Sequence, residues 1–410
     1  MKFLHTSDWH VGKTLKNRSR HAEQAAVLAE IIDIARDQEV DAVLIAGDLY
    51  ETAGPSAEAQ TLLVQALMAL RATGAEVIAI AGNHDHGTTF EAYRPLMRVA
   101  GIQLLGQARR VDDGGMVTFT ARSTGERVNV AVLPFLSQRY AIKAMQLLSA
   151  TPAQNAGRYD QQLRDIIDHL KTGFTPGAVN LVMAHLTVTG AAFGGGERQA
   201  QSIFEYSVPA TVFGAEPHYV ALGHLHRRQS LPAPCPVHYC GAPIAVDFGE
   251  QDNTSMVLLV EVSPTTPAEV TEIPLTRGRR LRTVYGTFAQ LLARADEFGE
   301  DYLRVYVSEP GRAGLVEELR TALPNALEIR IDPKFVAATT RSSSAGRMEQ
   351  QTPQELFDAY CAERTVDDEK VRALFARLHD EVTSADGPGR RPAATASATS
   401  RGPGRPRKRQ

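Results

Sequence analysis

Five short apolar segments of this 410-residue chain each end on side chains that can bind a metal ion. Apolar runs of four to eight residues, rich in Val, Ile and Leu, predict strands that are buried on both faces. In open α/β sheets, ligands bind beyond the carboxyl ends of such strands. We therefore expect residues from more than 200 positions of sequence to meet at one edge of a sheet. The residues are Asp8, His10, Asp48, Asn83, His84, His185, His224 and His226.

Side chains of this kind are typical of two-metal hydrolytic sites, which hold the attacking and leaving oxygens of an in-line displacement. Such a site needs a carboxylate that bridges both ions and neutral ligands that preserve its positive charge. Asp8 and Asp48 would leave roughly two of the four charges of two divalent ions for a hydroxide and a phosphate oxygen. Imidazole, carboxylate and amide ligands suit Mn²⁺ or Fe²⁺, with zinc as an alternative. We expect two divalent ions, with Mn²⁺ preferred.

The motifs around these positions resemble those of a known superfamily. DWH, GDLYE, GNHD, the lone His of MAHLT and GHLH match, in order, the motifs of the calcineurin-like metallophosphoesterases. More narrowly, LHTSDWHVGK, VDAVLIAGDLYETAGPS, AGNHD and ALGHLH followed by YCGAPI resemble the SbcD family, the nuclease subunits of bacterial SbcCD complexes. The resemblance is strong over about residues 1–275. It is confined to the general layout in the segments that follow, and it does not extend to the C-terminal tail.

The resemblance implies a role for each site residue. The first ion would be bound by Asp8, His10, Asp48 and His226. The second would be bound by Asp48, Asn83, His185 and His224, so that Asp48 bridges the two. His84 would not bind metal but would face the scissile phosphate and assist departure of the leaving group. Asp85 would orient His84.

Patterns of alternating strands and helices fill residues 1–275, the predicted metallophosphoesterase domain. Apolar residues at helical spacing predict helices at 21–38 and 56–72, the second with Ser56 as its N-cap and Gly74 just past its end. Buried strands are expected at 42–46, 76–81, VNLVMA, YVALG, VHYCGAP and SMVLLVEV. The alternation predicts the α/β class, as a layered α/β/α sandwich.

Three further parts are expected after this body. Residues 276–335 alternate strand, helix, strand, helix, strand, which predicts a small α+β capping domain. Residues 336–386 combine a polar linker with a module of two helices, TPQELFDAYCAER and DDEKVRALFARLHDEV. Residues 387–410 lack apolar periodicity, so a disordered basic tail is expected. The helices carry an apolar stripe formed by Leu356, Phe357, Tyr360, Val371, Leu374, Phe375 and Leu378.

The chain contains no Walker A sequence, so an ATPase that acts with it has to be a separate chain. The resemblance implies that this ATPase is SbcC, in a heterotetramer built on an SbcD homodimer. SbcC would dock on the apolar stripe of residues 336–386. The alternative is that the stripe closes a small local core, and both statements can hold in part.

The net charge of −3 conceals a basic C-terminal tail. Beyond Asp386 there are seven basic residues and no acidic one, which leaves the rest of the chain near −10. The sequence Gly-Arg-Pro at 404–406 resembles an AT-hook, whose arginines enter the narrow minor groove of A·T tracts. The alternative is a solvated tail of low complexity. The residues predicted to bind DNA are Arg405, Arg407, Lys408 and Arg409.

The cysteine content and the length of the apolar stretches exclude further classes of protein. The three cysteines form neither an even disulfide framework nor a zinc knuckle, so we expect reduced thiols and a cytoplasmic protein. No apolar stretch approaches the ~20 residues of a membrane span.

We therefore predict a two-metal DNA nuclease that cleaves double strands as an exonuclease and single strands or hairpins as an endonuclease. It would act in DNA end processing, repair, recombination and replication. One alternative is a small-substrate phosphomonoesterase or cyclic-nucleotide phosphodiesterase on the same core. Another is a DNA-end tether without catalysis. The segments beyond residue 275 favour the nuclease, since small-substrate members of the superfamily seldom carry them, and the complete set of ligands disfavours the tether.

Overall fold

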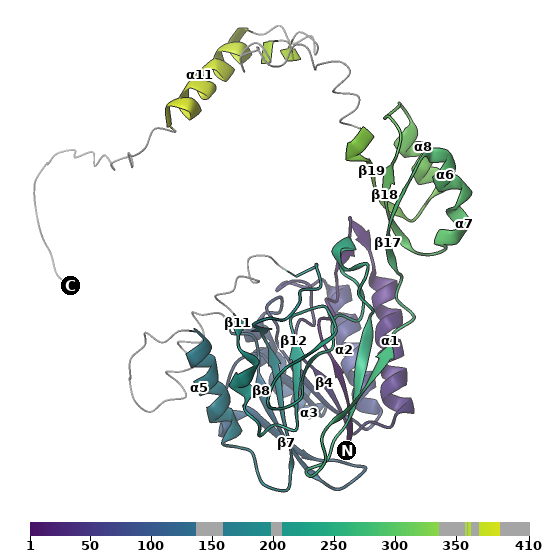
Figure 1. The fold of residues 1–410 in the computed structure, drawn as a ribbon. Coiled ribbons are helices and arrows are strands. Elements are labelled where there is room, and N and C mark those ends of the chain that lie inside the picture. The colour runs from purple at the N-terminus through teal and green to yellow at the C-terminus, as the bar shows by residue number, and fades with distance from the viewer. Residues whose placement is uncertain (137–158, 198–206, 336–356, 359, 362–368, 386–410) are drawn as a thin grey trace, which may run out of the picture. The chain divides into compact units, whose positions relative to one another are not determined.

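The computed structural model describes residues 1–136, 159–197, 207–335, 357–358, 360–361 and 369–385. The chain divides into one compact unit over Met1–Phe335 and a second over Val336–Gln410. The first unit contains two six-stranded sheets and a smaller sheet of three strands (Figure 1). Over these described ranges, no helix is both long enough and apolar enough to span a lipid bilayer.

The first sheet carries the N-terminal strands, in the order β16-β15-β1-β4-β5-β6. Strands β1, β4, β5 and β6 are parallel, because a helix returns the chain after each of the first three. These helices pack on one face of the sheet and share a hydrophobic core with it: α1 (His21–Asp37), α2 (Ala57–Ala72) and α3 (Gly87–Val99). The strands are β1 (Lys2–Thr6), β4 (Ala42–Ile45), β5 (Glu76–Ile80), β6 (Ile102–Leu105), β15 (Met256–Glu261) and β16 (Glu269–Pro274).

The second sheet has the order β13-β14-β12-β9-β8-β7 and is covered on its outer face by α5 (Tyr159–Lys171). Its strands are β7 (Met116–Thr120), β8 (Arg127–Leu133), β9 (Val179–His185), β12 (Tyr219–Gly223), β13 (Gln229–Leu231) and β14 (Val237–Tyr239). Shorter elements are β2 (Thr14–Leu15), β3 (Arg18–Ser19), β10 (Thr187–Val188), β11 (Ser207–Val208) and the 3-10 turns η1 (Val111–Asp113), η4 (Ala210–Phe213) and η5 (Phe248–Glu250).

The two large sheets face each other across a shared hydrophobic core. That core draws side chains from both, among them Phe3, Leu44 and Ile78 of the first sheet and Val130, Leu181 and Ala221 of the second. The α/β class is confirmed, but the expectation of a single sheet edge is wrong. A buried apolar strand has the same sequence whether its second face is covered by a helix or by another sheet.

Local sequence signals place several element ends where they were predicted. The Ser56 hydroxyl accepts a hydrogen bond from the Ala59 amide at 3.2 Å and so caps α2. Gly74 follows that helix with φ of +92°, a conformation that favours glycine. The helix predicted at 21–38 corresponds to α1, and the strand predicted at 76–81 corresponds to β5.

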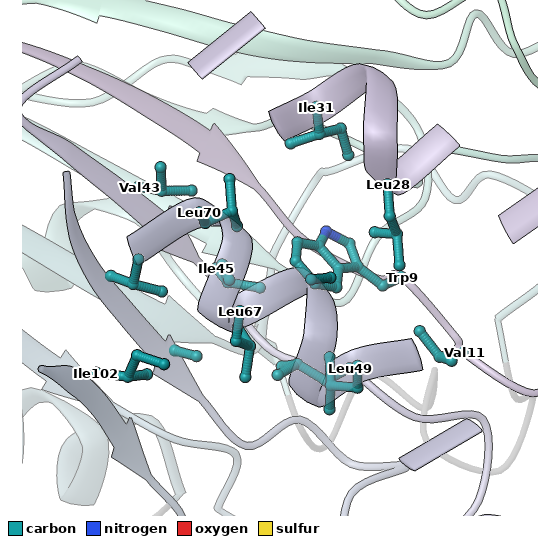
Figure 2. Packing of buried hydrophobic residues seen from close by; sticks show 14 of the residues in the cluster. Trp9, Val11, Leu28, Ile31, Val43, Ile45, Leu49, Leu67, Leu70 and Ile102 are labelled. Atoms are coloured by element: carbon teal, nitrogen blue, oxygen red, sulfur yellow. The ribbon is translucent and has the colours of Figure 1, made fainter. Parts of the chain in front are cut away.

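The single tryptophan anchors the loop that follows β1. Trp9 is 2% exposed and lies beside Leu28 and Ile31 of α1 in the hydrophobic core (Figure 2). Its indole N–H donates to the Thr6 hydroxyl at 2.9 Å. Because the residues on either side of Trp9 are both predicted metal ligands, this packing fixes the position of their backbone.

The three-stranded sheet belongs to the segment predicted as a capping domain, and its elements follow the predicted order. Its parallel strands are β17 (Leu281–Gly286), β18 (Tyr302–Val307) and β19 (Ala326–Ile331). The connecting helices are α6 (Phe288–Ala293), α7 (Ala295–Phe298) and α8 (Leu315–Ala322). The sheet and helices form a separate hydrophobic core. Thr287 and Gln290 form a capping box that starts α6.

In the second unit the structure describes α11 (Glu369–Ala385), which corresponds to the second predicted helix. The Phe375 ring of α11 stacks on Phe357, with centroids 4.0 Å apart. The predicted tail, with Arg405, Arg407, Lys408 and Arg409, lies outside the described residues, and so does most of the first predicted helix.

Candidate metal centre

Four residues of the candidate centre have φ in the left-handed region: Asp8 (55°), His10 (46°), Asp48 (52°) and His224 (107°). This conformation costs about 1–3 kcal/mol for a residue other than glycine and persists where surrounding contacts enforce it. The Asp8 amide donates to the Gly47 carbonyl at 2.9 Å, and the His10 amide donates to the Asp48 carbonyl at 3.0 Å. These bonds tie the loops after β1 and β4 together.

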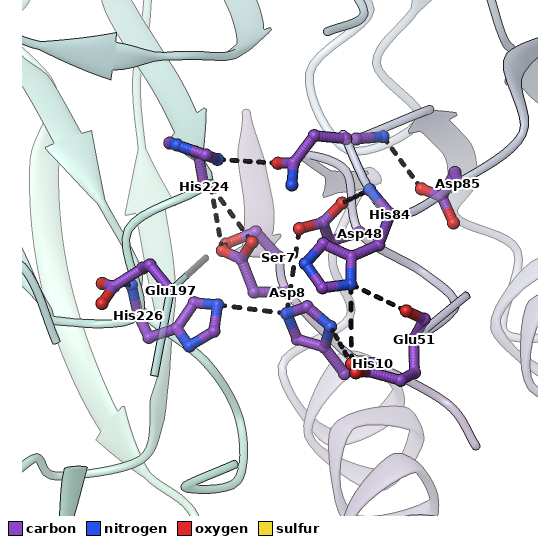
Figure 3. A network of polar contacts seen from close by, with 12 residues as sticks. Ser7, Asp8, His10, Asp48, Glu51, His84, Asp85, Glu197, His224 and His226 are labelled. Atoms are coloured by element: carbon purple, nitrogen blue, oxygen red, sulfur yellow. Dashed lines mark hydrogen bonds and ion pairs between the residues drawn. The ribbon is translucent and has the colours of Figure 1, made fainter. Parts of the chain in front are cut away.

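The eight residues predicted to meet do meet, and they come from both large sheets. Figure 3 shows how Asp8, His10, Asp48, His84, His224 and His226 gather. Asp8, His10 and His226 offer ligand atoms that lie within 4.8 Å of one another. The same holds for the set Asp48, His185 and His224, and for the set His10, Asp48 and His84. The Asn83 side-chain oxygen lies 2.9 Å from His185 Nε2 and 2.7 Å from His224 Nδ1. The predicted ligands therefore form two adjoining groups.

In the first group the imidazoles of His10 and His226 face each other and can share a cation. His10 Nδ1 lies 3.0 Å from a Glu51 carboxylate oxygen, and His226 Nδ1 lies 2.5 Å from one of Glu250. Each carboxylate favours a proton on Nδ1, so the two Nε2 atoms, 3.0 Å apart, turn lone pairs toward each other. Burial opposes protonation, but the hydrogen bond and charge of Glu250 raise the pKa of His226 to about 10. A proton or a metal ion has to occupy this contact.

In the second group, too, lone pairs of electrons face one another. His185 Nδ1 donates to the Ala46 carbonyl at 2.8 Å, which leaves the lone pair on Nε2. That lone pair faces the Asn83 oxygen, and an Asp48 carboxylate oxygen lies 3.6 Å from it. Facing acceptors repel one another unless a cation lies between them. The donor atoms of both groups thus fit divalent ions.

The pKa values of Asp48, His10 and His224 are all shifted toward the uncharged form of the side chain. Burial raises the pKa of Asp48 well above its usual range, and the nearby charges of Asp8 and Asp85 raise it further. Burial also lowers the pKa of His10 to about 3 and that of His224 to about 4. Buried carboxylates beside neutral imidazoles need an external cation to remain ionised.

His84 lies at the edge of these groups and is 7% exposed. Its Nδ1 lies 2.7 Å from the Glu51 carbonyl and 3.6 Å from a carboxylate oxygen of the same residue. Its backbone amide donates to Asp48 Oδ1 at 2.8 Å. The Glu51 carbonyl therefore orients the imidazole, and Asp48 fixes the backbone beneath it.

Asp85 was expected to orient the His84 ring, and its contacts in the structure correct that expectation. Its carboxylate accepts backbone N–H groups of Leu49, Tyr50 and Gly82 at 3.1, 2.9 and 2.8 Å. These bonds join the loop after β4 to the loop after β5. Asp85 thus acts on His84 and Asp48 through their loops.

Three glutamates support the centre and were missed from the sequence. Glu51 contacts His10 and His84, and Glu250 contacts His226. Glu197 accepts the His226 amide at 3.0 Å and the Gly194 amide at 2.6 Å. Glu51 stands in GDLYE, three residues after the bridging candidate, and could have been suspected. Glu250 lies 24 positions beyond His226 with no motif around it.

Comparisons with known proteins agree with this geometry. The family model described as calcineurin-like phosphoesterase matches residues 1–228, and that of the type 5 capsule protein repressor C-terminal domain matches 277–365. The chain is 31% identical over 401 residues to the SbcD nuclease of Bacillus subtilis (strain 168), covering 94% of this chain and 100% of that one. It is 29% identical over 302 residues to the SbcD nuclease of Escherichia coli (strain K12), covering 73% and 74%. The chain therefore belongs to the calcineurin-like phosphoesterases and, among them, to the SbcD family.

Proposed function

We propose that this chain is the metal-dependent DNA nuclease subunit of an SbcCD complex. The observation that carries the proposal is the pair of buried ligand groups that adjoin at Asp48, in a chain that matches an SbcD protein along nearly its whole length. Asp8, His10 and His226 would hold one ion, and Asn83, His185 and His224 the other, with Asp48 bridging both. Imidazole, carboxylate and amide donors without thiolate favour Mn²⁺.

Two bound ions would supply a nucleophilic hydroxide and neutralise the charge that builds up on the phosphate. The protein's own side chains do the rest. Glu51 and Glu250 keep the Nε2 atoms of His10 and His226 available as ligands. His84, whose Nδ1–H donates to the Glu51 carbonyl, would in its doubly protonated form present Nε2–H to the phosphate and give that proton to the departing oxygen. Asp85 keeps the two loops in register for this transfer.

The function is tested with the purified chain on a DNA hairpin and a blunt duplex, with Mn²⁺, in the presence and absence of SbcC and ATP. We expect cleavage of both substrates that stops on chelation of the metal. Faster hydrolysis of p-nitrophenyl phosphate or of a cyclic nucleotide, with no DNA cleaved in any arm, would instead identify a small-substrate phosphoesterase. Binding of DNA ends without hydrolysis would identify a tether.

A homodimer is proposed from the outer surfaces of α2 and α3. The apolar side chains Val64 and Met68 on α2 and Tyr93, Leu96 and Val99 on α3 are all exposed, Val99 by 88%. They recur at helical spacing, and both helices contact the edge strand β6. A second copy could cover this surface with the same residues, as in a twofold interface.

SbcC docking is proposed on the C-terminal helices. Along α11, Val371, Leu374 and Leu378 are 37%, 46% and 48% exposed and recur at helical spacing. Phe375, by contrast, stacks against Phe357, so part of the predicted stripe closes locally. The exposed part is the surface left for a partner.

Deletion of residues 336–410 should abolish association with SbcC and leave Mn²⁺-dependent cleavage of simple substrates intact. All the predicted ligands and their supporting glutamates lie before this segment. Co-purification with tagged SbcC measures the first effect, and a nuclease assay the second. The control is deletion of 387–410 alone, which retains α11 and should retain association. Unchanged recovery of SbcC with the longer deletion would place the contact elsewhere.

A further inference from the structure

One face of the three-stranded sheet in the cap carries a stacked pair of tyrosines, of which one is exposed and the other is half-buried. The pairing register aligns Tyr285 with Tyr306 and Tyr306 with Arg330 across β17, β18 and β19. Their neighbours Val284 and Val305 point into the core with the cap helices, so by alternation the row lies on the opposite face. The two rings lie 5.0 Å apart at an interplanar angle of 10°, and Tyr285 is 56% exposed. The row offers flat aromatic surface to a partner.

A basic cluster lies next to this row. Arg304 pairs with the Glu328 carboxylate at 3.1 Å, Lys16 lies 3.2 Å from the same carboxylate, and Arg330 also contacts it. Three cations thus share one carboxylate, which is 9% exposed, whereas the Arg330 side chain is 61% exposed. The cluster carries surplus positive charge, and this charge complements a polyanion.

The same face leads toward the metal centre. Its inner end, with Tyr302, packs in one cluster with Phe248 of η5. The Arg304 guanidinium lies 4.6 Å from the centre of the Phe248 ring. Glu250, at the end of the same turn, hydrogen-bonds His226 of the metal centre. A continuous path of contacts therefore links the tyrosine row to a predicted metal ligand.

We propose that this face binds an unpaired stretch of DNA, with bases stacked on Tyr285 and Tyr306 and phosphates paired with Arg330 and Lys16. Aromatic side chains beside basic ones bind single strands with little regard to sequence, because every base has a flat face. In a duplex the bases cover one another, so stacking of this kind selects an opened strand. The inference rests on the proposed nuclease function and specifies the form of DNA held beside the centre.

The test uses the full-length protein without metal, so that no DNA is cleaved. Fluorescence anisotropy measures affinity for oligodeoxythymidine and for a blunt duplex of the same length. Tyr285→Ala and Tyr306→Ala should each weaken single-strand binding roughly tenfold and duplex binding far less. Tyr285→Phe should retain the affinity because it keeps the ring. Arg330→Ala should reduce the salt dependence of binding, unlike Arg320→Ala on exposed α8 of the same domain.

Unchanged single-strand affinity in both alanine variants, with unchanged thermal unfolding, would overturn the proposal. Equal losses on single strand and duplex would also overturn it, as would weaker SbcC binding with DNA binding unchanged, which would identify a protein-docking surface. Hydrolysis of bis(p-nitrophenyl) phosphate by the wild-type protein with Mn²⁺ tests the phosphodiesterase function separately. Failure of either proposal can therefore be recognised without the other.

Discussion

Replacing Asp48 by Asn should abolish DNA cleavage and remove at least one metal ion from the purified protein. Asp48 stands between both ligand groups, so the loss of its charge would weaken both ions at once. Asn tolerates the left-handed backbone that this position adopts, so the substitution isolates the charge from the fold. Metal content by mass spectrometry and the cleavage rate on the same preparation measure the two effects.

The matched comparison replaces a histidine that belongs to one group only. His185→Ala and His226→Ala should each impair one ion and should be less damaging than Asp48→Asn. Thermal unfolding shows whether each variant is folded. An Asp48→Asn protein that retains two ions and cleaves DNA at a near-normal rate would refute the bridging role.

Replacing His84 by Ala should leave both ions bound while turnover falls by ~10²-fold or more, the usual scale for the loss of a proton donor or electrostatic help. The reason is that the ring is oriented by the Glu51 carbonyl at the edge of the ligand groups. Metal content is decisive because His84 also lies close enough to His10 and Asp48 to serve as a ligand. Loss of an ion would make His84 a ligand.

A neighbouring histidine provides the control for this substitution. The His86 ring Nδ1 lies 2.7 Å from the Thr89 hydroxyl at the start of α3, in an exposed position. His86→Ala should change turnover far less than His84→Ala. Equal losses would show that the assay reports disturbance of the GNHD loop and not the chemistry of His84.

The sequence predicts most of this fold because its signals are local. Ser56 caps α2 through an atom three residues away, and the apolar run before Asp48 is long enough to be recognised as a strand. The count of sheets was missed because it depends on what covers a strand's second face, and this is decided by distant segments. The antiparallel strand β16 was missed for a related reason, since none of its residues is fully buried and it has no continuous apolar run.

The residues of the candidate site differ in the same way, since some of them could be predicted from local sequence and others could not. Asp8, Asp48 and His224 could be predicted from the strands that precede them, since a strand end and a ligand-type side chain are both visible in sequence. Glu250 could not be predicted, because its role is to hydrogen-bond the His226 ring, and the two residues come together only in the folded chain. The predicted contact between Asp85 and the His84 ring was wrong. Asp85 instead accepts backbone N–H groups, and such partners leave no pattern of side chains in the sequence.

The division of the proposed ligands between two sheets has a consequence for how the enzyme comes into being. Asp8, Asp48 and Asn83 follow strands of the first sheet. His185 is the last residue of a strand of the second sheet, and His224 and His226 follow another strand of that sheet. During synthesis the first sheet's share of ligands emerges well before the last histidines, and contacts of such long sequence separation form late in folding. A nascent or half-folded chain therefore lacks a complete centre. Cleavage is expected only once both sheets have formed and packed on each other.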